Sequence, residues 1–198
     1  MDVLRLLPIE QNHARPNVTP RGFSSVRSVC LGKSAVSPAC TKFSHQRWAL
    51  FEFLATWLRT EAPHINTDFA SIVINEGYAA ALHRDDSSNV GLSVIRSLGT
   101  FSGGEILTHP GDDGVQSLSS LSIHDRVELP AHRFCEFAGR QAHQVLPFSG
   151  ERFSLVFFTP GNLFESAEPV LLKLLEHGAR FDLPAGSVSD SDGDSVES

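Results

Sequence analysis

The stretch HRDDSSNVGLSVIRSLGTFSGGEI, residues 83–106, decides how the rest of the chain is interpreted. Residues 91–98 form a short run typical of a β-strand, and the pair Gly103-Gly104 marks a turn before the next run. At the start of the stretch, His83 and Asp85 stand two residues apart. In an extended segment their side chains point to the same side. The stretch therefore predicts consecutive strands with two candidate metal ligands where they begin.

Short strand-like runs separated by turn residues extend on both sides of this stretch, and a helix is predicted before and after them. The predicted strands are 71–75, 91–98, 105–108, 133–137 and 152–159, and the predicted helices are 46–59 and 167–177. Many short strands with few helices favour a barrel or sandwich over a parallel α/β sheet. The sequence thus predicts a mainly β fold with flanking helices, of the α+β class.

Composition divides the chain into three parts. Residues 1–45 carry six basic residues against two acidic ones and show no sustained apolar period, which predicts a flexible basic N-terminal arm. Residues 46–184 are expected to form a single domain. Residues 185–198 are polar and acidic, and we expect a disordered tail there.

The charge and hydropathy of the chain bear on whether it binds nucleic acid or a membrane. The formal net charge is −7, which argues against a protein that binds nucleic acid mainly through phosphates, although a local basic groove stays open. No stretch approaches the roughly 20 apolar residues needed to span a bilayer, so no membrane partner is expected.

The three cysteines are odd in number and lack CxxC spacing, so they indicate neither a disulfide framework nor a zinc site. A reducing compartment, cytoplasmic or nuclear, is the expectation. The arm superficially resembles an organelle transit peptide, but its Met-Asp-Val start and Glu10 favour a flexible arm instead.

Two histidines and one carboxylate form the candidate metal site. His83 and Asp85 can hold one ion together, and His143 precedes a turn-like LPFSG that leads into the predicted strand 152–159. Two imidazoles and a carboxylate leave coordination positions open, which suits an Fe(II) ion that must also accept a cosubstrate and dioxygen. The same donors serve zinc, and in a chain with nine histidines an HxD pattern also arises by chance. The triad alone leaves the metal open.

Arg152 lies nine residues after His143, and Ser154 follows two residues later. If the two segments pair as an antiparallel hairpin, both side chains project from one face and approach the metal ligands. A guanidinium fork and a hydroxyl suit a carboxylate ligand. The alternative is a surface arginine paired with Glu151 or Glu136, but beside the triad the carboxylate clamp is favoured.

The stretch 83–106, followed by AGRQAHQVLPFSGERFSLVFFT at 138–159, resembles the 2-oxoglutarate/Fe(II)-dependent dioxygenase superfamily. Within it, the order HRD, N-x-G-x-S, GGE and H-x-x-x-P-F-x-G-E-R-F-S-L-V is similar to a TET/JBP-like group. The resemblance spans about residues 71–160 and implies a double-stranded β-helix, also called a jelly roll or cupin-like core. Its cofactors would be Fe(II), 2-oxoglutarate as cosubstrate, and dioxygen.

The resemblance also assigns roles to residues. It implies that His83, Asp85 and His143 are the iron ligands and the catalytic centre. It implies that Arg152 binds the distal carboxylate of 2-oxoglutarate with help from Ser154. Three further residues would line or brace the pocket: Asn75, Asn89 and Ser93.

The implied reaction is hydroxylation of a C–H bond, and the TET/JBP likeness points to a nucleobase methyl group, with a protein side chain or small molecule left open. The chain departs from the group on the substrate side, reading Phe137-Ala138-Gly139 where an Asp-Gly pair is common. Two alternatives remain: a non-catalytic jelly-roll binding module, and a cupin-like metalloenzyme that does not use 2-oxoglutarate. A nucleic-acid substrate would need phosphate contacts, for which the candidates are Arg84, Arg96, Arg126, Arg133 and Arg140.

Overall fold

The computed structural model describes residues 1–85 and 89–184, and strands dominate it. The strands are β1 (Gln11–Asn12), β2 (Val26–Gly32), β3 (Ser71–Glu76), β4 (Asn89–Leu98), β5 (Phe101–Gly103), β6 (Ile106–Thr108), β7 (Val127–Leu129), β8 (Cys135–Phe137), β9 (His143–Val145), β10 (Phe148–Gly150) and β11 (Phe153–Pro160). The α-helices are α1 (Asp2–Arg5), α2 (Trp48–Glu61) and α3 (Glu168–Glu176), with short 3-10 turns at Ser44–Gln46, Leu118–Ser120 and Leu163–Glu165.

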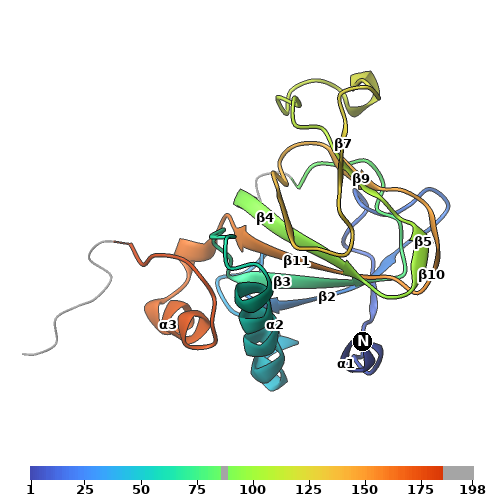
Figure 1. Ribbon diagram of the computed structural model, residues 1–198. Coiled ribbons are helices and arrows are strands. Elements are labelled where there is room, and N and C mark those ends of the chain that lie inside the picture. The colour runs from blue at the N-terminus through green and yellow to red at the C-terminus, as the bar shows by residue number, and fades with distance from the viewer. Residues whose placement is uncertain (86–88, 185–198) are drawn as a thin grey trace, which may run out of the picture.

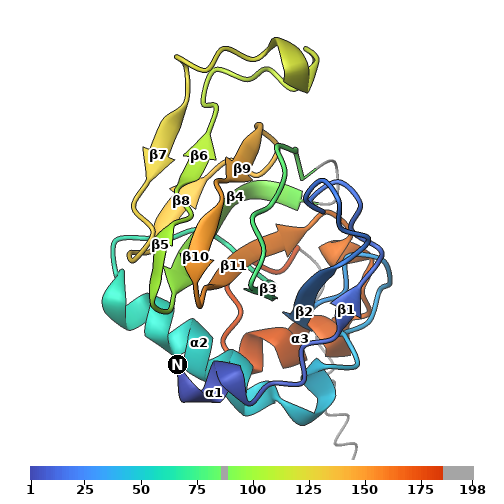
Figure 2. The ribbon, with the colours of Figure 1, turned by 90° about the vertical axis from the view of Figure 1, so that its right-hand side faces the viewer.

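One large sheet and two small ones make up the core. The large sheet has the strand order β1-β2-β3-β11-β4-β8, and the small ones are β7-β6-β9 and β10-β5. Every pairing is antiparallel. Figures 1 and 2 show α2 and α3 on one side of the large sheet and the small sheets on the other. This mainly β arrangement confirms the predicted fold class.

Side chains alternate between the two faces of the large sheet. Ile74 on β3 and Leu155 and Phe157 on β11 are fully buried and belong to the main hydrophobic cluster, together with the apolar stripe of α2. Their neighbours Asn75 and Ser154 face the opposite side, as period-two alternation requires. The helix side therefore carries the main cluster, whereas the other side lines a cavity and holds a smaller cluster of Ile95, Ile106 and Phe137. Within the described residues, no helix has the length and apolar character to cross a membrane.

The predicted helices and strands are found with small shifts at their ends, but residues 1–45 differ from the expected flexible arm. Strand β2 pairs in register with β3 along its whole length, from Arg27 opposite Glu76 to Gly32 opposite Ser71. Leu4 and Ile9 are also buried in the main cluster. In VRSVCLG the adjacent polar residues Arg27 and Ser28 are followed by the apolar run 29–31, so polar and apolar residues do not alternate regularly, and this weakened the strand signal. The predicted acidic tail, 185–198, lies outside the described residues.

Candidate metal centre and its pocket

A reciprocal pair of backbone hydrogen bonds brings two histidines together. The amide of His83 donates to the carbonyl of His143 at 3.0 Å, and the amide of His143 donates to the carbonyl of His83 at 2.9 Å. Two residues on, the amide of Asp85 donates to the carbonyl of Gly139 at 2.8 Å. The segment 83–85 is thus held beside β9 by its main chain, which sets the positions of all three side chains.

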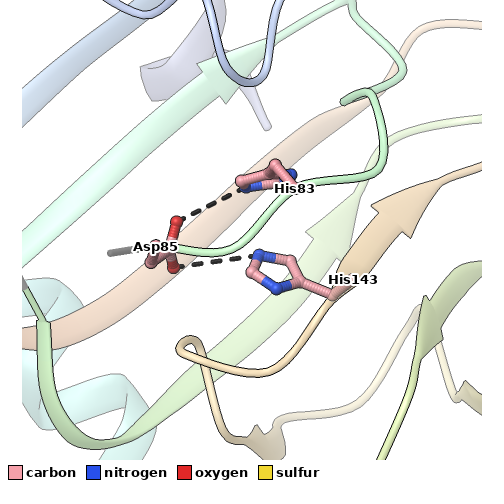
Figure 3. Close-up of side chains that lie close together, drawn as sticks. All are labelled: His83, Asp85 and His143. Atoms are coloured by element: carbon pink, nitrogen blue, oxygen red, sulfur yellow. Dashed lines mark ion pairs between the residues drawn. The ribbon is translucent and has the colours of Figure 1, made fainter. Parts of the chain in front are cut away.

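The three predicted ligands converge, as Figure 3 shows, with both imidazoles directed at the Asp85 carboxylate. Nε2 of His83 lies 3.4 Å from Oδ1 of Asp85, and Nε2 of His143 lies 3.8 Å from Oδ2. One donor atom from each residue falls within 4.8 Å of the others. Both histidines are buried, and Asp85 is partly exposed. This spacing can enclose a single ion.

The hydrogen bonds of the two imidazoles fix which nitrogen is free. Nδ1 of His83 lies 2.7 Å from the carbonyl oxygen of Ala81, and Nδ1 of His143 lies 2.8 Å from that of Gln141. A carbonyl oxygen only accepts, so each Nδ1 carries the proton and each Nε2 presents a lone pair. The resulting donor set of two imidazole nitrogens and one carboxylate fits an Fe(II) ion with open positions.

Charge at the site is also suited to a cation. Burial alone would raise the pKa of the Asp85 carboxyl, but the adjacent His83 and His143 outweigh it and lower that pKa below its usual range. Burial, with the nearby His83, lowers the pKa of His143. Asp85 is therefore anionic and His143 neutral near pH 7, the forms in which each is a metal ligand.

A cavity of about 680 Å³ opens beside the triad and is lined by His83, Asp85 and His143. Arg152 and Ser154 line the same cavity, as do Asn75 and Asn89. Its size lies within the range of about 300–1,000 Å³ usual for small-molecule sites. The structure thus brings most of the predicted site residues to one space.

Arg152 is a buried cation in this cavity, with only 3% of its surface exposed. Nη2 donates to Oγ of Ser97 at 2.8 Å, and the guanidinium carbon lies 5.5 Å from the ring centres of both Phe101 and Phe148. Burial lowers its pKa to about 10, so it remains protonated near pH 7. No carboxylate among residues 1–85 and 89–184 forms an ion pair with it, and its Nε has no hydrogen-bond partner there. The geometry leaves Arg152 suited to an anionic ligand.

The expected hairpin between His143 and Arg152 is wrong. Strand β9 pairs with β6, and β10 pairs with β5, so the LPFSG stretch enters a different sheet. Arg152 directly precedes β11 of the large sheet and lines the same cavity as the triad. The hairpin was inferred from adjacency in sequence, and a jelly roll instead sends successive strands to opposite sheets. Glu151, the alternative partner, pairs with Arg5 at 2.6 Å.

A polar row crosses the large sheet below Arg152. Ser28, Asn75 and Ser154 stand opposite one another on neighbouring strands β2, β3 and β11. Nδ2 of Asn75 donates to Oγ of Ser154 at 3.1 Å, and the hydroxyl of Tyr78 donates to Oδ1 of Asn75 at 2.7 Å. Asn75 therefore orients the Ser154 hydroxyl beside Arg152.

Asn89 and Ser93 brace the other side of the triad. Nδ2 of Asn89 donates to Oγ of Ser93 at 2.7 Å, and both residues are buried. Asn89 lines the cavity, whereas Ser93 stands behind it. A Cβ on Gly139 would lie 2.6 Å from Nδ2 of Asn89 and 2.7 Å from Oδ2 of Asp85, so any other residue there would push these two side chains aside. The Ala138-Gly139 pair thus makes room for the metal ligand.

Asp112 ties the segments that carry His83, Asp85 and His143 together. The only sequence signal near it was the turn Gly111-Asp112-Asp113-Gly114. Its Oδ2 accepts from Nε of Arg84 at 2.7 Å and from the amide of Ala142 at 2.7 Å. Arg84 lies between His83 and Asp85, and Ala142 precedes His143. Tyr78 was also missed, because it lies in the loop after β3, where no periodic pattern marks a contact with Asn75.

Two of the candidate phosphate contacts are engaged inside the molecule. Arg84 forms the ion pair with Asp112 at 2.6 Å. Arg96 pairs with Glu61 at 3.0 Å and stacks over the ring of Trp57. The other three, Arg126, Arg133 and Arg140, are exposed.

Comparisons with known proteins bear on the fold. No protein-family model matches the chain, and no curated protein sequence matches it. A protein of the 2OG-Fe(II) oxygenase family from Burkholderia pseudomallei has a similar structure, with a TM-score of 0.50 and 22% identity over 79% of this chain and 75% of that one. A Pseudomonas putida prolyl-4-hydroxylase gives a TM-score of 0.38 and 16% identity over 75% of this chain and 76% of that one, too weak a likeness for an argument. The chain has the double-stranded β-helix fold of the 2OG-Fe(II) oxygenase family.

Proposed function

We propose that this chain is an Fe(II)- and 2-oxoglutarate-dependent dioxygenase that hydroxylates a C–H bond. The observation that carries the proposal is Arg152, a buried guanidinium without a carboxylate partner among the described residues, in the cavity that the His83–Asp85–His143 triad lines. A buried charge is costly unless it is paired, so this position calls for an anionic ligand. A diacid that chelates a metal with one end and meets an arginine with the other satisfies both features.

The residues of the chain divide the work as follows. His83, Asp85 and His143 would hold the iron through two Nε2 atoms and one carboxylate oxygen. Arg152 would neutralise the distal carboxylate of 2-oxoglutarate, with the Ser154 hydroxyl as a further donor. When bound, iron would supply the oxidative chemistry, which couples decarboxylation of 2-oxoglutarate to succinate with conversion of a C–H bond to an alcohol by dioxygen.

Packing around Arg152 supports the cosubstrate role. Phe101 and Phe148 exclude water from the guanidinium and stiffen it, and the Ser97 hydroxyl sets its rotation. A charge-assisted contact gains strength where water is excluded. The arginine is thus placed for a fixed anion.

The substrate is the finer part of the proposal. The TET/JBP likeness favours a nucleobase methyl group, which requires a base to leave its stack and enter the cavity. Arg126, Arg133 and Arg140 are the exposed arginines left to contact a phosphate backbone. Protein side chains and small molecules remain candidates, and the substrate screen below includes all three classes.

The test is the weak visible charge-transfer band of an iron–2-oxoglutarate chelate, recorded on anaerobic protein loaded with Fe(II). We expect the band in wild type, its loss in His143→Ala, and a higher 2-oxoglutarate requirement in Arg152→Gln. The exposed residues His124 and Arg133 provide matched controls, His124→Ala and Arg133→Gln, which should leave the band unchanged.

The absence of the band in folded, iron-loaded wild-type protein would refute the 2-oxoglutarate assignment and leave a cupin-like metalloenzyme. Failure to bind iron at all would leave the non-catalytic jelly roll. If the band forms, succinate release is then measured with methylated and unmodified oligonucleotides, peptides and small acids.

A further inference from the structure

The N-terminal segment 12–18 forms one wall of the cavity. Asn12, Arg15 and Val18 line it together with the triad. Three hydrogen bonds hold the segment in place: from Asn12 Nδ2 to Ser28 Oγ at 3.2 Å, from the amide of Ala81 to the carbonyl of Val18 at 3.1 Å, and from Arg15 to Asn75. The segment, which is irregular after its first residue Asn12 at the end of β1, is thus anchored to the sheet and to the chain just before His83.

Arg15 is the charged residue of this wall. Nη1 lies 3.3 Å from Oδ1 of Asn75, a long and weak contact, and the side chain is half-buried. No ion pair joins it to a carboxylate within the part of the chain that the structure describes. A second arginine therefore enters the cavity with its main hydrogen-bonding capacity unused by the protein.

The charges that line the cavity do not balance without another anion. Arg15 and Arg152 are positive, and Asp85 is the acidic residue among the lining residues. An Fe(II) ion adds two positive charges, and 2-oxoglutarate removes two. One positive charge then remains, and Asn75, which contacts both Arg15 and Ser154, separates it from the cosubstrate end.

The cavity continues beyond the polar row into an apolar part. Two residues further along the strands, Cys30, Val73 and Val156 face one another and line the cavity. Val29 and Phe158 extend this lining. An occupant of this part has an apolar body and an anionic group within reach of Arg15.

We propose that Arg15 anchors the carboxylate or phosphate of the primary substrate, a small molecule with an apolar body. The inference rests on the proposed function, because it assigns the Arg152 half of the cavity to 2-oxoglutarate. A small acid is favoured over a base within a strand, because segment 12–18 walls the cavity and the chain has a net charge of −7.

The experiment measures binding rather than turnover. Anaerobic protein with Fe(II) and saturating 2-oxoglutarate is titrated calorimetrically with hexanoate, hexyl phosphate and the neutral analogue hexanamide. A single-stranded oligonucleotide containing 5-methylcytosine is the fourth probe. The variants are Arg15→Gln, which removes the charge, and Arg21→Gln, at an exposed arginine that lies three residues beyond the segment and does not line the cavity. The chelate band is recorded throughout.

We expect hexanoate or hexyl phosphate to bind wild-type protein about tenfold or more tightly than hexanamide, because the anion gains a charge-assisted hydrogen bond. Which of the two binds identifies the anion. Arg15→Gln should abolish the preference, and Arg21→Gln should keep it. Both variants should form the chelate band at the wild-type concentration of 2-oxoglutarate.

Several results would overturn the inference. One is equal binding of the acids and the amide, or no binding of either acid. Another is a preference that survives in Arg15→Gln. A chelate band that needs more 2-oxoglutarate in Arg15→Gln would assign Arg15 to the cosubstrate. Binding of the oligonucleotide alone, weakened by Arg15→Gln, would make the anion a strand phosphate. If the wild-type protein forms no chelate band, the proposed function itself is refuted. This result is distinguishable from failure of the Arg15 inference, in which the band forms but the preference for the anion is absent.

Discussion

Replacing Asp112 with asparagine tests whether one buried carboxylate supports both the fold and the metal centre. The Asp112 side chain has no exposed surface, and it accepts two hydrogen bonds from Arg84 and one each from the amides of Gly114 and Ala142. The hydrogen bonds from Arg84, with help from the two amides, lower the pKa of Asp112 from its ordinary 3.8 to about 2.

That change in pKa sets the magnitude. At about 1.4 kcal/mol for each tenfold difference, the ionised form is favoured by about 2 kcal/mol more in the folded protein than in the unfolded chain. The folded-state pKa is the lower one, so this contribution is fully present above about pH 4 and is lost as the pH falls towards 2. Asp112→Asn should therefore lower the free energy of unfolding by about 2 kcal/mol near pH 7.

The assay is urea unfolding of both proteins between pH 2 and pH 7, with iron affinity measured at pH 7 by titration. The stability difference should shrink towards zero near pH 2, and the variant should bind Fe(II) about 10- to 100-fold more weakly, as expected when the groups that orient metal ligands are removed. Asp113→Asn, an exposed neighbour, is the matched control. A difference between wild type and Asp112→Asn that stays constant across this pH range would refute the electrostatic reasoning. Unchanged iron affinity would refute the positioning role.

Three further predictions concern the site and the core. Gly139→Ala should weaken Fe(II) binding at least about tenfold, because the added Cβ would lie 2.7 Å from Oδ2 of Asp85. Gly111→Ala is the control and should leave Fe(II) binding unchanged, since no atom lies within 4 Å of its added carbon. Equal Fe(II) titration curves for the two variants would contradict this prediction. Leu155→Ala should lower the free energy of unfolding by about 2–5 kcal/mol, because the Leu155 side chain is fully buried. Leu172 is 46% exposed, so Leu172→Ala should change that free energy by less than about 0.5 kcal/mol. Similar losses of stability for the two variants in denaturant unfolding would contradict the described core. Fe(II) at 100 times its dissociation constant should stabilise the protein by about 2.7 kcal/mol, and a chelator should reverse the shift in melting temperature; a melting curve insensitive to Fe(II) would count against the site.

Much of the site could be predicted because its residues are close in sequence or carry strong patterns. His83 and Asp85 are two residues apart. Arg152 and Ser154 alternate in sequence with the apolar residues Phe153 and Leu155, which indicated that they share one face of the strand. The predicted helix and strand ends were nearly right because apolar periodicity follows the buried face. What the sequence could not give was the pairing of strands, which is why the hairpin joining His143 to Arg152 was wrong.

The missed residues share a physical cause. Arg15 belongs to a segment without a strand or helix, and its role depends on the tertiary contacts of residues 12–18 with β2 and β3. Asp112 was hidden in a turn, because its partners Arg84 and Ala142 are about 30 residues away along the chain. Long-range contacts of irregular segments leave no periodic trace in the sequence.

The alternation of side chains on β3 and β11 separates two kinds of mutational constraint within single strands. A substitution at Ile74 or Leu155 acts on the helix-covered core and changes whether the chain folds. A substitution one residue away, at Val73 or Val156, alters the wall of the cavity and spares the main cluster, although Val156 also packs against the smaller cluster of Ile95, Ile106 and Phe137. Evolution, or a designer, can therefore change the selectivity of this scaffold at the cavity-facing positions with less effect on the main cluster than at the alternate positions.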